Sequence, residues 1–172
     1  MKENNSLRAL VIGNALLIFL ISINGRSFES FFFSLINEKY MHIFIGAFFI
    51  LGFISVWFIL RGEVKNFKSF FYASFICFII MAISQGFIIK PVEKIHLILF
   101  SFFGLFCSYY LNVRNAIIIS LIMSLADELL QYFLPERYFG WGDVLINSYA
   151  SVLTVLIFYF TKKNKIWNIF WY

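Results

Sequence analysis

Charged residues are scarce in this 172-residue chain, where Asp, Glu, Lys and Arg make up 13% of the sequence, about half the share of a soluble domain. With 2 prolines and 62% hydrophobic residues, the chain is not a disordered protein. The 2 cysteines, Cys77 and Cys107, lie in apolar runs and form no C-x-x-C pair, which excludes a zinc ribbon or a thiol redox motif. We expect both to be buried as small hydrophobic residues.

The remaining composition predicts an integral membrane protein with one domain. Aromatic residues make up 22% of the chain, and 25 residues are Phe. The net charge of +5 does not indicate a nucleic-acid partner, because the basic residues lie between apolar segments, where membrane topology accounts for them. Membrane lipids are therefore the expected surroundings.

Apolar runs near the length of about 20 residues that crosses a bilayer as a helix recur along the chain. They predict an all-α, polytopic transmembrane bundle of about six helices, at residues 9–23, 41–60, 69–89, 96–111, 116–133 and 144–161. The first run is short and contains Asn14. A cleaved signal peptide is its alternative, but no small-x-small cleavage site follows, so we expect a retained helix. Short links predict antiparallel neighbours.

Basic residues set the predicted orientation, because cytoplasmic links carry an excess of Lys and Arg. With both termini in the cytoplasm, the inner segments hold nine of the 14 Lys and Arg residues and the outer segments hold the other five. The end of the chain, residues 162–172, is then a basic, aromatic cytoplasmic tail. This orientation places the starts of the helices at 96–111 and 144–161 at the outer face.

Acidic and amide side chains interrupt the apolar run at 116–133. Asp127, Glu128 and Gln131 are three or four residues apart, so they share one neighbouring helix surface. A charged carboxylate at mid-depth in a bilayer costs about 2.5–3.5 kcal/mol on insertion scales, so such residues face the bundle interior or a wet cavity. The pattern repeats in the next helix, where Asp143 and Asn147 are four apart. Asp143 could serve there only as a helix cap, but a cap does not explain Asn147.

The link between these two helices contains one Pro and one Arg of interest. Pro135 is expected to end the helix at 116–133. The guanidinium group of Arg137 suits bidentate binding of a carboxylate or a phosphate. The alternative is a salt bridge to Glu136, Asp143 or Glu128.

A histidine opens the helix at 96–111, on the same predicted membrane side as the acidic residues. His96 could be only an interfacial hydrogen-bonding group, but an imidazole titrates near neutral pH and could act as a base or a ligand. His42 begins an earlier helix in a similar segment, which leaves a duplicated helix pair open. We rank His42 lower, because no carboxylate accompanies it in its own helix pair.

The ordered polar set resembles the VanZ-like family of small bacterial membrane proteins. The residues that carry the resemblance are His96, Asp127, Glu128, Gln131, Pro135, Arg137, Asp143 and Asn147. It covers residues 69–161 as a four-helix core, with two additional helices in 1–68 and the tail after it. The chain departs from the family at Glu136, Ala150 and Thr154, where Gly is frequent; the last two are still small enough for close helix packing.

The resemblance implies a role in the bacterial cell envelope, in the inner membrane, and supplies neither a reaction nor a cofactor. The best-known member of the family is associated with resistance to a glycopeptide antibiotic of the teicoplanin type. The first hypothesis is a pocket at the outer face that binds or modifies an anionic lipid or glycan intermediate. In it, Glu128, Asp143 and His96 do acid–base work. The ligand-binding residues would be Asp127, Gln131, Arg137 and Asn147.

Two other functions are open at this point. A transporter or flippase could use intramembrane carboxylates as a proton relay, although the polar residues cluster at one face. A non-catalytic scaffold could use them to lock helices together, although such bonds average only about 0.6 kcal/mol in one measured system. A metal at His96, Glu128 and Asp143 has suitable ligand types but no diagnostic spacing, so none is predicted.

Overall fold

The computed structural model describes residues 5–35, 91–135 and 137–162, and within 40–79 the separate residues 40, 43, 46, 47, 50–52, 54, 57, 70, 71, 74, 75, 77 and 79. Every regular element in this part of the chain is an α-helix, which confirms the all-α prediction. The helices are α1 (Asn5–Leu35), α4 (Pro91–Tyr110), α5 (Val113–Tyr132) and α6 (Trp141–Lys162). The predicted helices at 41–60 and 69–89 and the tail fall largely outside the described residues.

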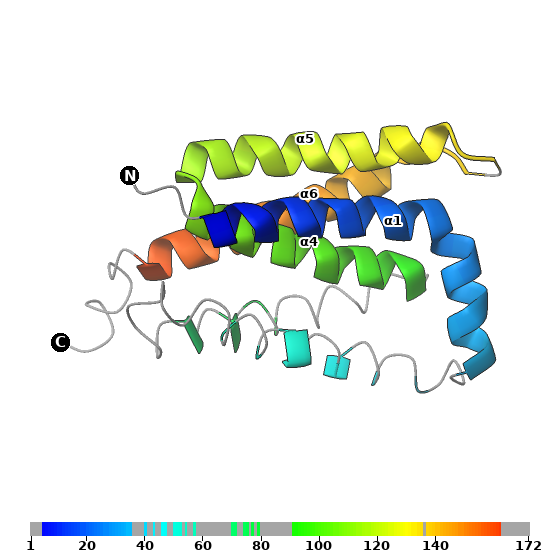
Figure 1. Ribbon diagram of the computed structural model, residues 1–172, viewed down its shortest axis with the longest axis horizontal. Helices are drawn as coiled ribbons and strands as arrows, with labels where there is room; N and C mark the ends of the chain where they lie inside the picture. The colour runs from blue at the N-terminus through cyan, green and yellow to red at the C-terminus, as the bar shows by residue number, and fades with distance from the viewer. Residues whose placement is uncertain are drawn as a thin grey trace.

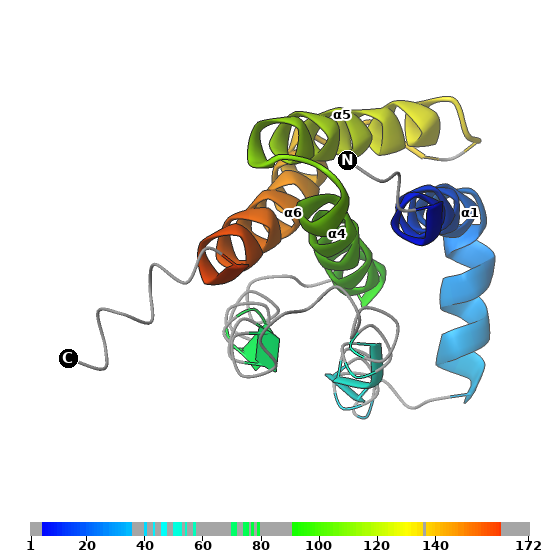
Figure 2. The same cartoon turned by 60° about the vertical axis from the view of Figure 1, so that its left-hand side comes forward.

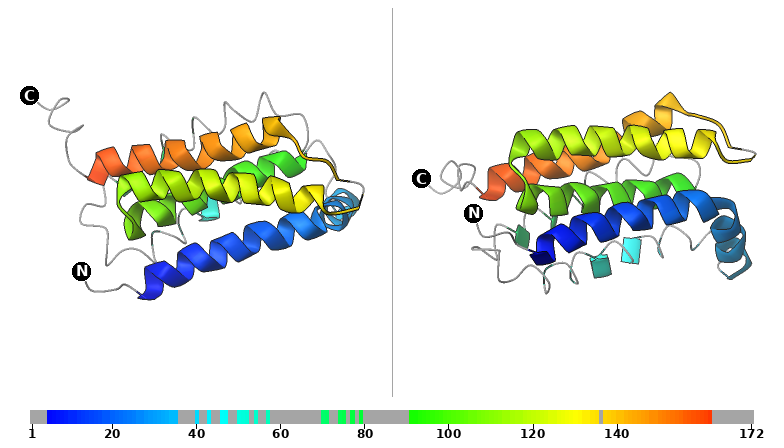
Figure 3. Two further views of the ribbon diagram at one scale, coloured as in Figure 1. Left: turned by 90° about the horizontal axis from the view of Figure 1, so that it is seen from above. Right: turned by 45° about the horizontal axis from the view of Figure 1, so that its top comes forward.

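The four described helices form a bundle in which α4 contacts each of the other three (Figure 1). Seen along the bundle, α4 lies between α1 on one side and α6 on the other (Figure 2). Successive helices α4, α5 and α6 run antiparallel, as the short links predict (Figure 3). The beginning of α1 and the end of α6 lie at one end of the bundle, and the α5–α6 link lies at the other (Figure 1).

Local chemistry accounts for the limits of α5. The side chain of Asn112 accepts a hydrogen bond from the Asn115 backbone N–H at 2.9 Å, which satisfies one of the free donors of the first turn. The helix ends at Tyr132, and the N–H of Phe133 turns back to the Leu130 carbonyl at 3.1 Å. Pro135 follows, so the predicted helix stop is confirmed.

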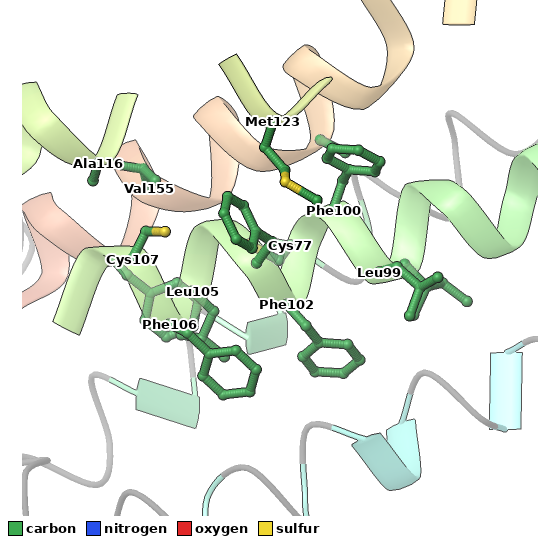
Figure 4. Close-up of a cluster of buried hydrophobic side chains, with 14 of the residues drawn as sticks. Cys77, Leu99, Phe100, Phe102, Leu105, Phe106, Cys107, Ala116, Met123 and Val155 are labelled. Atoms are coloured by element: carbon green, nitrogen blue, oxygen red, sulfur yellow. The ribbon is translucent and has the colours of Figure 1, made fainter. Parts of the chain in front are cut away.

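The apolar core lies between α4, α5 and α6 (Figure 4). Met123 on α5 lies next to Phe100 on α4, and Val155 on α6 lies near Ala116 on α5 and Cys107 on α4. Cys77 and Cys107 are both buried and free, as expected from their apolar surroundings.

Small residues bring α4 and α6 into close approach. A Cβ atom at Gly104 of α4 would overlap the backbone carbonyl oxygen of Ser151 on α6. Ala150 and Thr154, which flank Ser151 on α6, are fully buried. The expectation that these small residues allow close packing is therefore confirmed, and Gly104 is the residue on α4 that makes it possible.

Helix α5 reverses the usual distribution of polar and apolar side chains. Ser124, Asp127 and Glu128 are buried, whereas Ile122 and Leu129 are exposed on the opposite surface. Among the described residues, two stretches are long and apolar enough to cross a membrane, Asn5–Gly25 and Trp141–Phe160, and less than half of each is buried within the bundle. An apolar exterior around a polar interior is the distribution expected for helices surrounded by lipid.

Candidate functional site

The carboxylate of Asp127 is the centre of a polar cluster contributed by three helices. Ser22 on α1 donates its hydroxyl hydrogen bond to Asp127 Oδ1. On the other oxygen, Oδ2, Gln131 Nε2 donates at 3.2 Å and His96 Nδ1 on α4 lies 3.3 Å away. Asp127 is fully buried, so these neighbours replace the water that a carboxylate would otherwise bind.

Gln131 connects Asp127 to its neighbour Glu128 and to Arg137. Its Nε2 also donates to Glu128 Oε1 at 3.1 Å, and its Oε1 accepts a hydrogen bond from Arg137 Nη1 at 3.3 Å. An arginine can only donate, so the amide oxygen must face Arg137 and the amide nitrogen must face the two carboxyl groups. One neutral side chain thus separates the guanidinium charge from Asp127 and Glu128.

Glu128 and Asp143 approach the same glycine. The backbone N–H of Gly140 donates to Glu128 Oε2 at 3.0 Å. On Gly140, a Cβ atom would lie 2.6 Å from Asp143 Oδ2. The α5–α6 link therefore holds both carboxyl groups close to one peptide, and the absence of a side chain at Gly140 leaves room for the Asp143 carboxylate in its present position.

Asp143 lies in the first turn of α6, where the helix dipole favours a negative charge. The side chain makes no hydrogen bond to any residue that the structure describes, so the alternative role as a helix cap is not seen. Its carboxylate is half-buried and has capacity for a further donor.

The guanidinium group of Arg137 rests against α1. A Cβ atom at Gly25 would overlap Arg137 Nη2, so the absence of a side chain at this position makes room for the arginine. In the described ranges, Arg137 forms no ion pair with Glu128 or Asp143; Glu136 lies outside those ranges. Its hydrogen-bond partner there is the neutral amide of Gln131.

Asn147 lies one turn further along α6 than Asp143 and is 1% exposed. Among the described residues, its Nδ2 atom has no hydrogen-bond partner, and no hydrogen bond joins Asn147 to the cluster around Asp127. Nearby, Ser124 Oγ on α5 donates to the Val144 carbonyl of α6 at 2.7 Å and joins the two helices. Asn147 is thus buried with an Nδ2 donor that is unused among the described residues.

The structure connects five of the seven predicted site residues, His96, Asp127, Glu128, Gln131 and Arg137, through hydrogen bonds and the contact of His96 with Asp127. Asp143 adjoins this group through Gly140, and Asn147 is not joined to it by any hydrogen bond between described residues. The pairing differs from the simplest expectation, because His96 faces Asp127, and Glu128 and Asp143 meet at Gly140. Ser22 and Gly25 of α1 were missed. Their only signal in the sequence is their spacing of three residues, which places the hydroxyl group of Ser22 and the missing side chain of Gly25 on one helix surface.

The cluster combines acidic, basic and amide groups in a protein interior. Such a set can move protons and orient an anionic ligand. Within the described segments, no three His, Cys, Asp or Glu side chains come together as they would around a metal ion.

Comparison with protein families gave one match: the sequence model described as VanZ/LLP1 matches residues 6–162. This range covers α1, α4, α5 and α6 and therefore every member of the polar cluster. Comparison with curated proteins and with solved structures gave no match. The division of the chain at residues 68 and 69 stays a prediction.

Proposed function

Since the chain belongs to the VanZ-like family, we propose that it is a polytopic protein of the bacterial inner membrane that binds an anionic cell-envelope lipid or glycan intermediate. The binding site is the polar cluster around Asp127, at the outer face. Acid–base chemistry on the bound group is the second part of the proposal.

The membrane location is supported by the surface of α5. In water, a helix that buries Asp127 and Glu128 and exposes Ile122 and Leu129 would lose both hydration and apolar burial. In lipid, both placements are favourable. The orientation is supported by the excess of Lys and Arg in the segments predicted to be cytoplasmic. It is also supported by the α5–α6 link, which carries Arg137 and Gly140 and lies at the end of the bundle opposite the beginning of α1 (Figure 1).

Anion binding rests on one observation: Arg137 is half-buried beside the cluster, yet it donates to the neutral amide of Gln131. A guanidinium group has five N–H donors, and only the bond from Nη1 is formed with the described residues. A phosphate or carboxylate could accept two parallel hydrogen bonds from the remaining N–H donors. The unused Nδ2 donor of Asn147 supports an oxygen-rich ligand in the same region.

The acid–base roles remain those expected from the sequence. Glu128 and Asp143, which share Gly140, and His96, which faces Asp127, would carry protons to and from the ligand. Gln131, Arg137 and Asn147 would hold it. This assignment is compatible with binding alone or with a chemical step.

The test is stabilisation by a defined anionic probe, because a ligand of the native state raises its resistance to unfolding. Dihexanoyl phosphatidylglycerol, added below its micelle concentration to the detergent-purified protein, should raise the unfolding temperature more than dihexanoyl phosphatidylcholine. Arg137→Ala should remove this difference. Arg114→Ala is the matched control, because Arg114 is exposed at the other end of α5. An equal shift in wild type and Arg137→Ala would refute anion binding at this site.

A scaffold is the second candidate, favoured by the bonds that tie α1 to the cluster through Ser22 and Gly25. Glu128→Gln and Asp143→Asn separate the two functions. If the cluster only locks the helices, these variants should lose folded protein in proportion to any loss of function. If it handles protons, they should insert and fold but fail to complement a deletion strain.

The family resemblance extends the proposal to glycopeptide susceptibility. A deletion strain should then differ from its parent in sensitivity to teicoplanin, and the wild-type gene should restore the parental value. If teicoplanin sensitivity is unchanged, the protein has no role in glycopeptide resistance. Anion binding is then still tested by the stabilisation with phosphatidylglycerol.

A further inference from the structure

His96 is buried against a carboxylate on one side of its ring. Its Nδ1 lies 3.3 Å from Asp127 Oδ2, and its side chain is 9% exposed. We propose that Asp127 is a positioning residue that holds the proton of neutral His96 on Nδ1, so that Nε2 is the proton acceptor of the site. The use of Nε2 as a base rests on the proposed function, but the position of the proton on the ring is independent of any ligand.

Both side-chain oxygens of Asp127 act as hydrogen-bond acceptors. Ser22 donates to Oδ1 and Gln131 donates to Oδ2, so both oxygens already receive hydrogen bonds. If the lone pair of Nδ1 faced Oδ2 at 3.3 Å, two concentrations of negative charge would repel each other in a buried site. The proton therefore belongs on Nδ1, between the imidazole and the carboxylate.

The other ring nitrogen is left with a lone pair and no described partner. No hydrogen bond to Nε2 is formed with the residues of α1, α4, α5 or α6, although the side chain is about nine-tenths buried. The ring also stacks on Phe100, one turn along α4, with ring centroids 6.4 Å apart and planes 30° apart. Two contacts thus limit rotation of the imidazole, and Nε2 is presented as an acceptor in a fixed direction.

In the proposed reaction step, Nε2 takes the proton of a hydroxyl group or a water molecule. The O–H bond breaks, the N–H bond forms, and the oxygen keeps the electron pair as the nucleophile. The imidazolium that results lies beside Asp127, whose negative charge stabilises it. The same division of roles, with a carboxylate that orients the histidine and a histidine that moves the proton, operates in serine hydrolases.

This assignment changes the role expected for Asp127 from the sequence. A fully buried carboxylate with Ser22, Gln131 and His96 around it has little capacity left for a ligand. It acts through His96, while Glu128 and Asp143 stay the carboxyl groups available to a ligand.

The chain has 2 histidines, so a His42→Gln variant leaves His96 as the single imidazole. In this variant, labelled with ¹⁵N-histidine in lipid nanodiscs, nitrogen NMR reports which ring nitrogen carries the proton. The spectrum is recorded for the neutral form of the imidazole, to which the proposal applies. The proposal predicts a protonated Nδ1 and a bare Nε2. A proton on Nε2 in the His42→Gln protein would overturn the proposal.

Two substitutions in the same background assign the cause. Asp127→Asn should move the proton of His96 to Nε2, as loss of an orienting carboxylate does in a serine protease. Glu128→Gln is the matched control, because Glu128 is the adjacent carboxyl group with Gly140 and Gln131 as its partners, and it should leave the proton on Nδ1. If Asp127→Asn keeps the proton on Nδ1, Asp127 is not the positioning residue. If Nε2 carries no proton but phosphatidylglycerol does not stabilise the protein, anion binding is refuted while the role of Asp127 toward His96 still stands.

Discussion

Gln131 Oε1 accepts a hydrogen bond from Arg137 Nη1 at 3.3 Å, and this bond fixes the orientation of the Gln131 amide within the polar cluster. With its oxygen held by the arginine, the amide turns its nitrogen to Asp127 and Glu128. The carboxyl groups are thereby satisfied without direct contact with the guanidinium group. The positive charge stays available on the side of the cluster formed by the α5–α6 link.

The first prediction concerns the amide of Gln131. In Gln131→Glu, one oxygen can still accept from Arg137, but the other replaces a donor between two carboxyl groups and repels them. We expect the free energy of unfolding to fall by at least about 1 kcal/mol, the scale of an unsatisfied buried polar group. Unfolding in sodium dodecyl sulfate measures it. Stability equal to wild type would mean that the amide does not bridge these groups.

The second prediction concerns the glycine beneath Arg137. In Gly25→Ala, the new Cβ displaces the tip of a flexible side chain, so the fold should survive while Arg137 loses its position. Gly13→Ala, in the same helix, is the control, because a Cβ there meets nothing within 4 Å.

The readout is the stabilisation by dihexanoyl phosphatidylglycerol. Gly25→Ala should weaken it nearly as much as Arg137→Ala, and Gly13→Ala should leave it unchanged. Full stabilisation in Gly25→Ala would show that the contact between α1 and Arg137 has no part in binding.

The third prediction concerns Ser22. Ser22→Ala removes a donor from a buried carboxylate, and we expect a loss of about 1–3 kcal/mol in the free energy of unfolding. Ser30→Ala, at an exposed position on the same helix, should change it by no more than about 0.5 kcal/mol. Equal effects of the two substitutions would argue against the bond between α1 and Asp127.

The fourth prediction concerns the close approach of α4 and α6. In Gly104→Ala, the added Cβ meets the rigid backbone carbonyl of Ser151, so the helices must separate. Overpacking of this kind costs about 1–3 kcal/mol, which chemical unfolding in detergent would detect. A variant as stable as wild type would show that the two helices are not this close.

Much of the architecture could be predicted from local sequence features. Apolar runs located α4, α5 and α6 to within five residues, and Pro135 marked the end of α5, because both effects act along one segment. The helix predicted at 9–23 is longer in the structure, where α1 extends from Asn5 to Leu35 through the polar residues that follow the apolar run. Spacing along a helix also placed Asp127, Glu128 and Gln131 on one surface.

The partners of these residues could not be predicted in the same way. Spacing defines a face of one helix but leaves open the rotation of the helix opposite, so whether His96 faces Asp127 or Glu128 was undetermined. Ser22 and Gly25 carry no charge and resemble other small residues of an apolar run. Their role depends on the packing of α1 against α4 and α5, which is a property of the folded bundle.

The most direct test of anion binding through Arg137 is a competition measured by native mass spectrometry. The detergent-purified protein is equilibrated with an equimolar mixture of phosphatidylglycerol and phosphatidylcholine and then freed of detergent in the mass spectrometer. The ratio of the two lipids that stay bound to the protein is recorded. Loss of a charge-assisted hydrogen bond of about 1.5–3 kcal/mol corresponds to roughly tenfold or more in affinity. The ratio should therefore favour phosphatidylglycerol in wild type and fall about tenfold in Arg137→Ala. The same ratio in both proteins would contradict the account.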